Sequence, residues 1–154
     1  MTEFDTRDKL SCLVPHKGKM LLLDRIVSFD LEQAQVVTEI DISDKSMFFE
    51  ESFGGIPVWI VFEYMAQSVS ALTGIFGLQA GTPPRMGFIL SVTNFCAEVS
   101  VFPKGSTVQI EVRQTLRVDM AVTFEGKAFV GEKCVATATI NAVDVEDPKK
   151  VLGV

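Results

Sequence analysis

The sequence predicts an α+β fold in which an antiparallel sheet wraps around one long central helix. The chain has 154 residues, enough for one ordinary domain, and no repeat or linker-like stretch divides it. A helix-like stretch at residues 57–78 contains Glu63 as its only charged residue. Segments on both sides have the composition of strands. Because so apolar a helix must be buried on nearly all sides, a sheet that curls around it is the economical packing. We therefore expect one domain over residues 1–154.

Glycine and proline residues predict where the helix begins and ends. Gly54 and Gly55 predict a turn before it, Pro57 suits its first turn, and Gly77–Gly81 supplies signals that end it. The stretch is long enough to raise the question of a membrane span. Polar residues dilute the apolar run and strands flank it, so we expect a buried core helix and no membrane span; these polar residues are Glu63, Gln67, Ser68, Ser70 and Thr73.

The strands follow from short-period patterns. Val108–Leu116 alternates apolar and polar residues, as a strand with one solvent-exposed face does. Gly126, or Gly131 with Glu132, could turn a hairpin. Antiparallel pairing is the natural arrangement for such runs. The other strands are expected at residues 22–29, 35–40, 86–92, 96–101, 121–130 and 134–145.

Composition excludes several classes of protein. The net charge is -6 with both signs interspersed, so no basic patch for nucleic acid is expected. Cys12, Cys96 and Cys134 are odd in number and widely spaced, which predicts reduced core thiols instead of a disulfide framework or a metal site. No nucleotide-binding glycine loop is present either, so we expect no metal and no cofactor. The N-terminal residues have charges of both signs and no apolar run, which favours a cytoplasmic location.

Two motifs carry a family resemblance. Pro15–Arg25 is similar to the Pro-His-Arg-x-Pro-x-Leu-Leu-x-Asp-Arg opening of bacterial 3-hydroxyacyl-[acyl carrier protein] dehydratases. Glu63–Gln67, which reads Glu-Tyr-Met-Ala-Gln, resembles the Glu-Ala-Met-Ala-Gln start of that family's central helix. The resemblance runs from about Leu13 to the last strand. Residues 58–67 together with 83–88 are similar to a divergent branch, the dehydratase-like proteins of aryl polyene pigment clusters.

This resemblance implies a fold, partners and a reaction. The fold would be the hot-dog fold, and the protein would form a homodimer or a heterodimer with another hot-dog subunit. It would eliminate water from a 3-hydroxyacyl thioester, carried on the phosphopantetheine arm of an acyl carrier protein, to give the trans-2-enoyl thioester. The sequence departs from the family at Ser52, which stands where the family has the histidine of His-Phe-Pro-Gly. The loop between Pro57 and Glu63 is also shorter than in the family.

Dehydration requires a base beside the thioester and an acid for the departing hydroxyl. Burial of Glu63 on an apolar helix would disfavour its charged form, so we expect it to be the general acid. An alternative is that Glu63 only pairs with a buried cation or caps a backbone group. His16 is the only histidine of the chain and is therefore the candidate base. It could equally be a structural histidine.

Substrate contacts are expected from four further residues. Gly54 and Gly55 lie before the helix, where backbone N–H groups could stabilise the thioester oxygen; Gly55 is placed in this oxyanion region. Gln67 lies one turn beyond Glu63 and could bond its carboxyl group, a substrate hydroxyl or the backbone. Trp59 completes the predicted substrate-binding set.

Two other functions stay open at this point. The same fold can carry an acyl thioesterase in which a carboxylate activates water. The absence of the usual histidine at Ser52 also allows a non-catalytic acyl-binding subunit that completes another dehydratase. Release of free thiol would identify the first alternative, and full activity of a Glu63→Gln complex the second.

Overall fold

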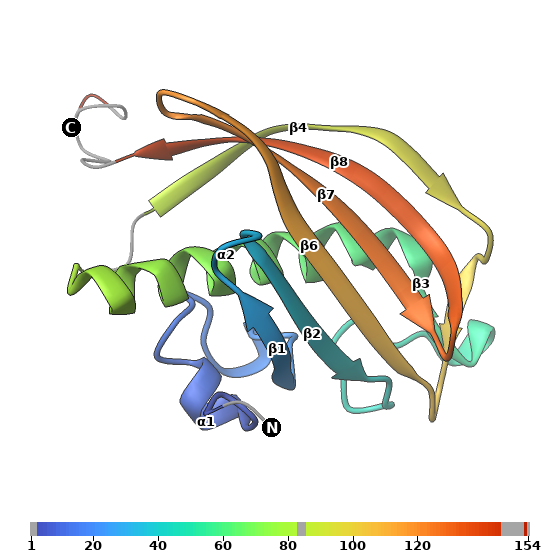
Figure 1. Cartoon of the computed structure of the whole chain (residues 1–154). Coiled ribbons are helices and arrows are strands. Elements are labelled where there is room, and N and C mark those ends of the chain that lie inside the picture. Colours follow the sequence, from blue (N-terminus) through green and yellow to red (C-terminus); the bar gives the residue numbers. More distant parts are fainter. Residues whose placement is uncertain (1–2, 83–85, 146–152, 154) are drawn as a thin grey trace.

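The computed structural model describes residues 3–82, 86–145 and 153 of the chain. It consists of a strongly curved sheet that wraps around one long helix, α2 (Figure 1). All neighbouring strands of the six-stranded sheet are antiparallel, in the order β1-β2-β6-β7-β8-β4. The strands are β1 (Arg25–Asp30), β2 (Gln35–Asp41), β4 (Met86–Ala97), β6 (Thr107–Val118), β7 (Ala121–Val130) and β8 (Lys133–Val145). The prediction of a hot-dog fold is confirmed.

The central helix is approached through a short strand and a tight turn. β3 (Gly55–Pro57) pairs with β5 (Val101–Pro103) to form a separate two-stranded sheet. The 3₁₀ turn η3 (Val58–Ile60) then leads into α2 (Val61–Ala80). The helix ends at Gly81, whose left-handed backbone, with φ of 66°, terminates it as a C-cap glycine does. Three short helical elements complete the chain: α1 (Arg7–Leu10), η1 (Gly18–Met20) and η2 (Glu51–Phe53).

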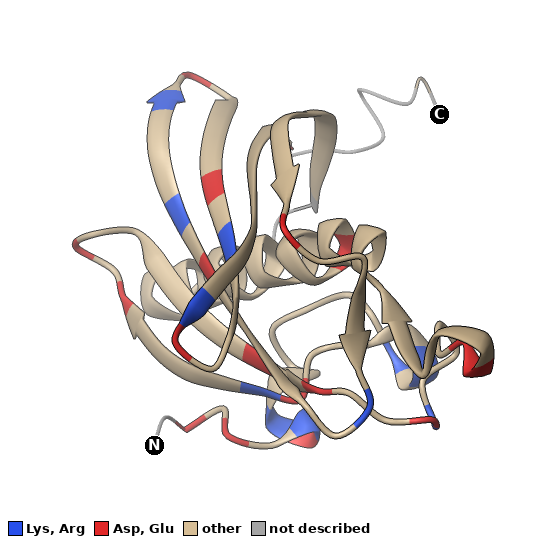
Figure 2. Ribbon diagram, turned by 90° about the vertical axis from the view of Figure 1, so that its right-hand side faces the viewer, with Lys and Arg blue, Asp and Glu red and all other residues tan. Residues whose placement is uncertain are grey.

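The core lies between α2 and the concave face of the sheet. Met65 and Leu72 of the helix are buried there with Val36, Ile110 and Val112 of the strands. By length and composition, Val58–Ala80 could cross a membrane, but 56% of its most apolar window is buried inside the fold. Charged residues lie on the strands and loops around α2, whose ribbon is almost entirely tan in Figure 2. This is the arrangement of the core helix of a soluble protein.

The structure corrects two details of the strands. The strand predicted at residues 96–101 does not exist as one element, because β4 continues through a bulge to Ala97 and β5 begins only at Val101. Gly126 does not turn a hairpin; it lies in the middle of β7, and the turn falls at Gly131 and Glu132. A Cβ atom at Gly126 would lie 2.6 Å from Sδ of Met65, so glycine is needed there for helix packing.

The prediction that the cysteines are core thiols is wrong for the single chain. Cys12 and Cys96 are exposed, and Cys134 is half-buried. All three are free thiols. Cys96 lies on β4 at the edge of the sheet, and Cys12 follows the exposed helix α1, so neither position reaches the core. The residues Pro83, Pro84 and Arg85 of the motif noted above lie outside the described part of the chain.

Candidate active site

His16 and Glu63 face each other across the start of α2. The Nε2 atom of His16 lies 3.5 Å from Oε1 of Glu63. Glu63 belongs to the first turn of α2, whereas His16 comes from the segment between α1 and η1. The fold thus brings together the two residues that the sequence nominated as acid and base, although they are far apart along the chain.

The environment of the pair differs from the prediction in one respect. The sequence led us to expect Glu63 to be desolvated, but 41% of its side chain is exposed in the single chain. The carboxylate lies at the open side of α2 instead of within the core. The His16 side chain is 26% exposed, and its Nδ1 atom is buried with no hydrogen-bond partner among the described residues. Nε2 is therefore the nitrogen that can exchange a proton with Glu63 or with a bound molecule.

A cavity of about 300 Å³ opens beside the pair. Its walls come from α2, from the first part of β4 and from the facing strands β7 and β8. A neighbouring cavity of about 380 Å³ continues along α2 toward its C-terminal end. The two cavities share four lining residues, Thr73, Arg117, Phe124 and Asp144. The two cavities are therefore neighbours along α2, and the first of them is lined by His16 and Glu63.

The shared wall of these cavities is not purely apolar. Arg117 of β6 lies with one guanidinium nitrogen 3.6 Å from a carboxylate oxygen of Asp144 in β8. Asp144 is largely buried, with 14% of its side chain exposed. The sequence analysis missed both residues. Without the register of strand pairing, a polar residue of a strand that faces a cavity looks the same as one that faces solvent.

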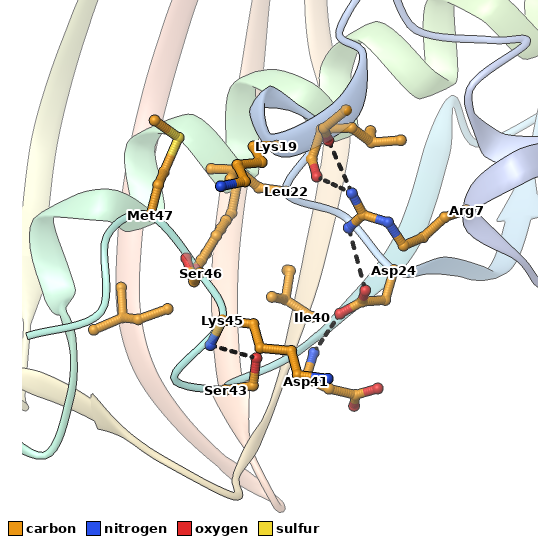
Figure 3. A pocket seen from close by; sticks show the side chains of 14 residues that line it. Arg7, Lys19, Leu22, Asp24, Ile40, Asp41, Ser43, Lys45, Ser46 and Met47 are labelled. Carbon is orange, nitrogen blue, oxygen red and sulfur yellow. Dashed lines mark hydrogen bonds and ion pairs between the residues drawn. The ribbon is translucent and has the colours of Figure 1, made fainter.

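A separate cavity of about 440 Å³ lies beside residues 18–24 (Figure 3). Its lining combines apolar residues such as Ile40 and Met47 with the charged side chains of Lys19, Asp24 and Lys45. None of its described lining residues is shared with the cavity at His16 and Glu63. It therefore contributes nothing directly to the acid–base pair.

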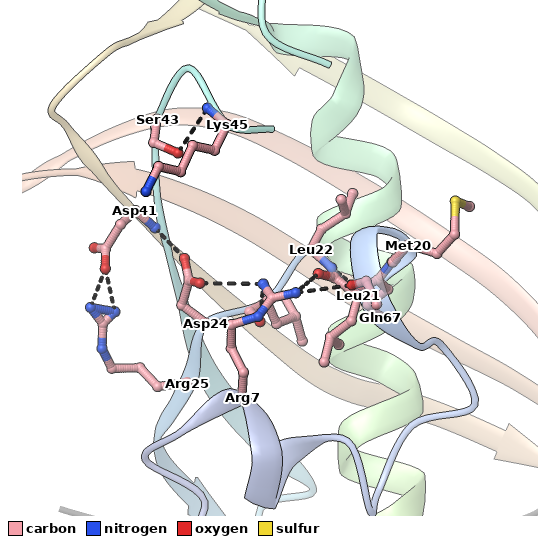
Figure 4. A network of polar contacts seen from close by, with 12 residues as sticks. Arg7, Met20, Leu21, Leu22, Asp24, Arg25, Asp41, Ser43, Lys45 and Gln67 are labelled. Carbon is pink, nitrogen blue, oxygen red and sulfur yellow. Dashed lines mark hydrogen bonds and ion pairs between the residues drawn. The ribbon is translucent and has the colours of Figure 1, made fainter. Parts of the chain in front are cut away.

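Gln67 connects the pair to the preceding segment of the chain (Figure 4). Its amide nitrogen donates to Oε1 of Glu63 at 3.0 Å and to the Met20 carbonyl at 2.8 Å. Its amide oxygen accepts from the Leu22 N–H at 2.8 Å. The side chain is fully buried. Of the contacts considered from the sequence, Gln67 thus makes those to the Glu63 carboxyl and to the backbone, and contact with substrate stays a prediction.

The other predicted substrate-binding residues lie elsewhere. The N–H of Gly54 donates to the Glu51 carbonyl at 3.1 Å, and that of Gly55 is directed at the Glu50 carbonyl at 3.4 Å. A Cβ atom at Gly55 would lie 2.0 Å from the Phe102 carbonyl oxygen, so the glycine permits the close pairing of β3 with β5.

Neither glycine, nor Trp59, is among the described residues that line the cavity at Glu63. Trp59 is 58% exposed on η3. Ser52, at the position of the family's histidine, is exposed on η2. Contact of Gly54, Gly55 and Trp59 with substrate stays a prediction.

Comparisons with known proteins identify the family of the chain. The family model described as ApeP-like, ApeP dehydratase, matches residues 9–153. A 3-hydroxyacyl-[acyl-carrier-protein] dehydratase FabZ from Caulobacter sp. (strain K31) is 31% identical, over 88% of this chain and 83% of the relative. The FabZ of Xanthomonas oryzae pv. oryzae (strain PXO99A) is 27% identical, over 86% of this chain and 88% of the relative.

A solved structure has the same fold. The dehydratase heterocomplex ApeI:P from Xenorhabdus doucetiae superimposes with a TM-score of 0.83 at 20% identity. The superposition covers 93% of this chain and 95% of that one.

Proposed function

Because the chain belongs to the ApeP-like dehydratase family, it is a dehydratase-like lyase of the hot-dog fold, and we propose that it dehydrates 3-hydroxyacyl groups held by an acyl carrier protein. The observation that carries the proposal is the His16–Glu63 pair, 3.5 Å apart in the wall of a cavity. An imidazole and a carboxylate that face each other at a cavity are the acid–base groups that the elimination of water requires.

The proposed reaction uses the two side chains in sequence. Nε2 of His16 takes the proton from C2 of the 3-hydroxyacyl thioester, and the electrons of that C–H bond form the C2–C3 double bond. The C3–O bond breaks, and protonated Glu63 gives its proton to the departing hydroxyl, which leaves as water. The proton left on His16 then passes to Glu63 over the 3.5 Å gap, which restores both groups. The products are the trans-2-enoyl thioester and one water molecule.

The acyl group would lie along α2. The two neighbouring cavities follow α2 from Glu63 past Thr73 toward the C-terminal half of the helix. The wall of the cavity at Glu63 is mostly apolar, which suits an acyl tail, whereas half of the described residues that line the neighbouring cavity are polar, Arg117 and Asp144 among them. We place the thioester at His16 and Glu63 and the distal part of the acyl chain beyond Phe124.

Partners enter the proposal in two ways. An acyl carrier protein would deliver the substrate near His16, and Lys19 is a cation of that segment that forms no ion pair with any described residue. The Xenorhabdus structure is that of a dehydratase heterocomplex, and FabZ enzymes are named for carrier-bound substrates. We propose a dimer, either of two copies or with a second hot-dog subunit, in the cytoplasm.

The experiment is a mass-spectrometric assay on purified protein. A 3-hydroxyacyl group is loaded on an acyl carrier protein through its phosphopantetheine arm, in alkyl and aryl forms, and loss of one water is followed on the intact carrier. We expect the enoyl product with no release of free thiol. Release of thiol without loss of water would identify a thioesterase instead. Absence of both with every acyl group would leave the non-catalytic subunit as the function.

A further inference from the structure

Arg7 holds the segment that follows His16 from one side. Its guanidinium donates to the carbonyl oxygens of Leu21 at 2.7 Å and Gly18 at 3.0 Å, and more weakly to that of Leu23 at 3.5 Å. It also contacts a carboxylate oxygen of Asp24 at 3.4 Å. These contacts join α1 to residues 18–24, which Figure 4 shows converging on the guanidinium. A planar guanidinium with five donors in a fixed fork can bind three carbonyls and a carboxylate at once, whereas a lysine ammonium has only three donors on a single nitrogen.

Gln67 holds the same segment from the helix. It bonds the Met20 carbonyl and the Leu22 N–H, whereas Arg7 bonds the carbonyls of Leu21 and Leu23. The two side chains therefore bind alternate residues of the segment from Met20, the last residue of η1, to Leu23. The amide nitrogen of Gln67 also donates to Glu63, so Gln67 links this segment to the carboxylate.

His16 lies at the start of this fixed stretch. Only Lys17 separates it from Gly18, whose carbonyl Arg7 binds. The ammonium of Lys17 donates to the carbonyls of Ser11 and Val14, which fixes the chain just before His16 as well. The His16 ring has no hydrogen bond at Nδ1 within the described chain, so its position depends on the backbone that carries it.

We propose that Arg7 is a positioning residue for the His16–Glu63 pair. Its guanidinium fixes residues 18–23 against Gln67, and this keeps Nε2 of His16 within reach of Glu63. The inference rests on the proposed function for its catalytic consequence, but its structural core is independent of the substrate. The family match begins at residue 9, so Arg7 lies before the matched region.

The test follows the reactivity of the only imidazole in the chain. Diethyl pyrocarbonate modifies accessible imidazole, and with a single histidine the rate belongs to His16, after subtraction of a His16→Ala blank. The rate is measured for wild type, Arg7→Ala, Arg7→Lys and Lys9→Ala. Lys9 is the matched control because it lies on the same short helix and pairs only with Asp5 among the described residues. Thermal unfolding confirms that each variant is folded at the assay temperature.

We expect faster modification of His16 in Arg7→Ala, little recovery in Arg7→Lys, and the wild-type rate in Lys9→Ala. On carrier-bound substrate, kcat of Arg7→Ala should fall on the order of 10-fold to 100-fold with KM nearly unchanged, because a small displacement of a catalytic group costs about this much. Equal modification rates in Arg7→Ala and Lys9→Ala would overturn the inference. A wild type that dehydrates nothing would refute the proposed function and leave the modification result to decide the role of Arg7 alone.

Discussion

At the scale of single residues, the candidate site depends on the carboxylate of Glu63, which a hydrogen bond orients and which stays partly exposed. Oε1 of Glu63 accepts a hydrogen bond from Gln67 and faces Nε2 of His16, while much of the side chain stays open to the cavity. An acid that must exchange protons with substrate and with its neighbour needs both properties. The buried amide of Gln67 supplies the orientation, and the exposed face supplies the access.

Tyr64, the next residue on α2, has the opposite environment and a predictable response to pH. It is the only tyrosine, it is 1% exposed, and burial, with a smaller contribution from the charge of Asp24, raises the pKa of its phenol. Above about pH 10 the phenol of the unfolded chain loses its proton, whereas the folded phenol keeps it. Folding stability should therefore be complete below that pH and fall as the pH rises further.

An ultraviolet titration of phenolate absorbance alongside circular dichroism measures this directly. We expect Tyr64 to ionise only together with unfolding, and the alkaline loss of stability to shrink in Tyr64→Phe. Ionisation near pH 10 in a chain that is still folded would show that the phenol is not desolvated.

Residue types alone were enough to nominate part of the candidate site. Glu63 stood out as the only charge on an apolar helix, and His16 as the only histidine, so both could be nominated without a structure. The role of Gly55 could not be read in the same way, because its contact with Phe102 arises from β3–β5 pairing between distant parts of the chain. Nothing in the sequence singled out Arg7, because an arginine that binds backbone carbonyls belongs to no recognisable sequence motif.

At the scale of elements, the fold depends on how closely α2 approaches the sheet. Met65 lies directly against β7, and the strand has Gly126 at the contact. The sequence predicted both the helix and the strand, because their periodicities differ clearly. It did not predict that a glycine in the strand marks the contact with the helix, since a glycine between two apolar runs is just as typical of a turn.

The contact predicts a loss of stability in Gly126→Ala. The new methyl group would lie 2.6 Å from Sδ of Met65, so this buried side chain must change its position or the helix must move away from the strand, at a cost of about 1–3 kcal/mol in the free energy of unfolding. Gly87→Ala is the matched control, because its nearest neighbour would be the Val143 carbonyl at an ordinary 3.5 Å. Urea unfolding measures both.

A second substitution tests the origin of that loss. Met65→Ala removes the side chain that the new methyl group meets, so the double variant Met65→Ala/Gly126→Ala should be less destabilised than the sum of the two single variants. Additive losses, or equal losses in Gly126→Ala and Gly87→Ala, would contradict the packing argument.

At the scale of the whole molecule, one edge of the sheet is left open. Among the described residues β4 pairs only with β8, and three large apolar side chains along it, Ile89, Leu90 and Phe95, are exposed in the single chain. A long apolar edge strand of this kind is normally covered by another chain. The sequence indicated a curved sheet around one helix, but which strand forms the edge is set by the long-range order of pairing, which local patterns do not encode.

This edge predicts where a partner binds. Leu90 is 66% exposed, so Leu90→Lys should weaken association while leaving the fold of the chain intact. Met47→Lys is the control, because Met47 is similarly exposed at 53% but lies in the loop after β2, a strand that is far from β4 in the order of the sheet. Sedimentation velocity over a range of concentrations distinguishes the species. A dimer that persists in Leu90→Lys and dissociates in Met47→Lys would place the interface elsewhere.

The central claim is that His16 and Glu63 act as one acid–base pair, and the most direct measurement compares the rates of water loss from a carrier-bound 3-hydroxyacyl group in His16→Ala, Glu63→Gln and the double variant. Each single variant should lose about 10²- to 10⁴-fold in rate. The double variant should be little slower than either, because residues that act as a unit are not additive. Glu51→Gln, on exposed η2, should keep the wild-type rate. Wild-type rates in either single variant, with the chain folded, would contradict the account.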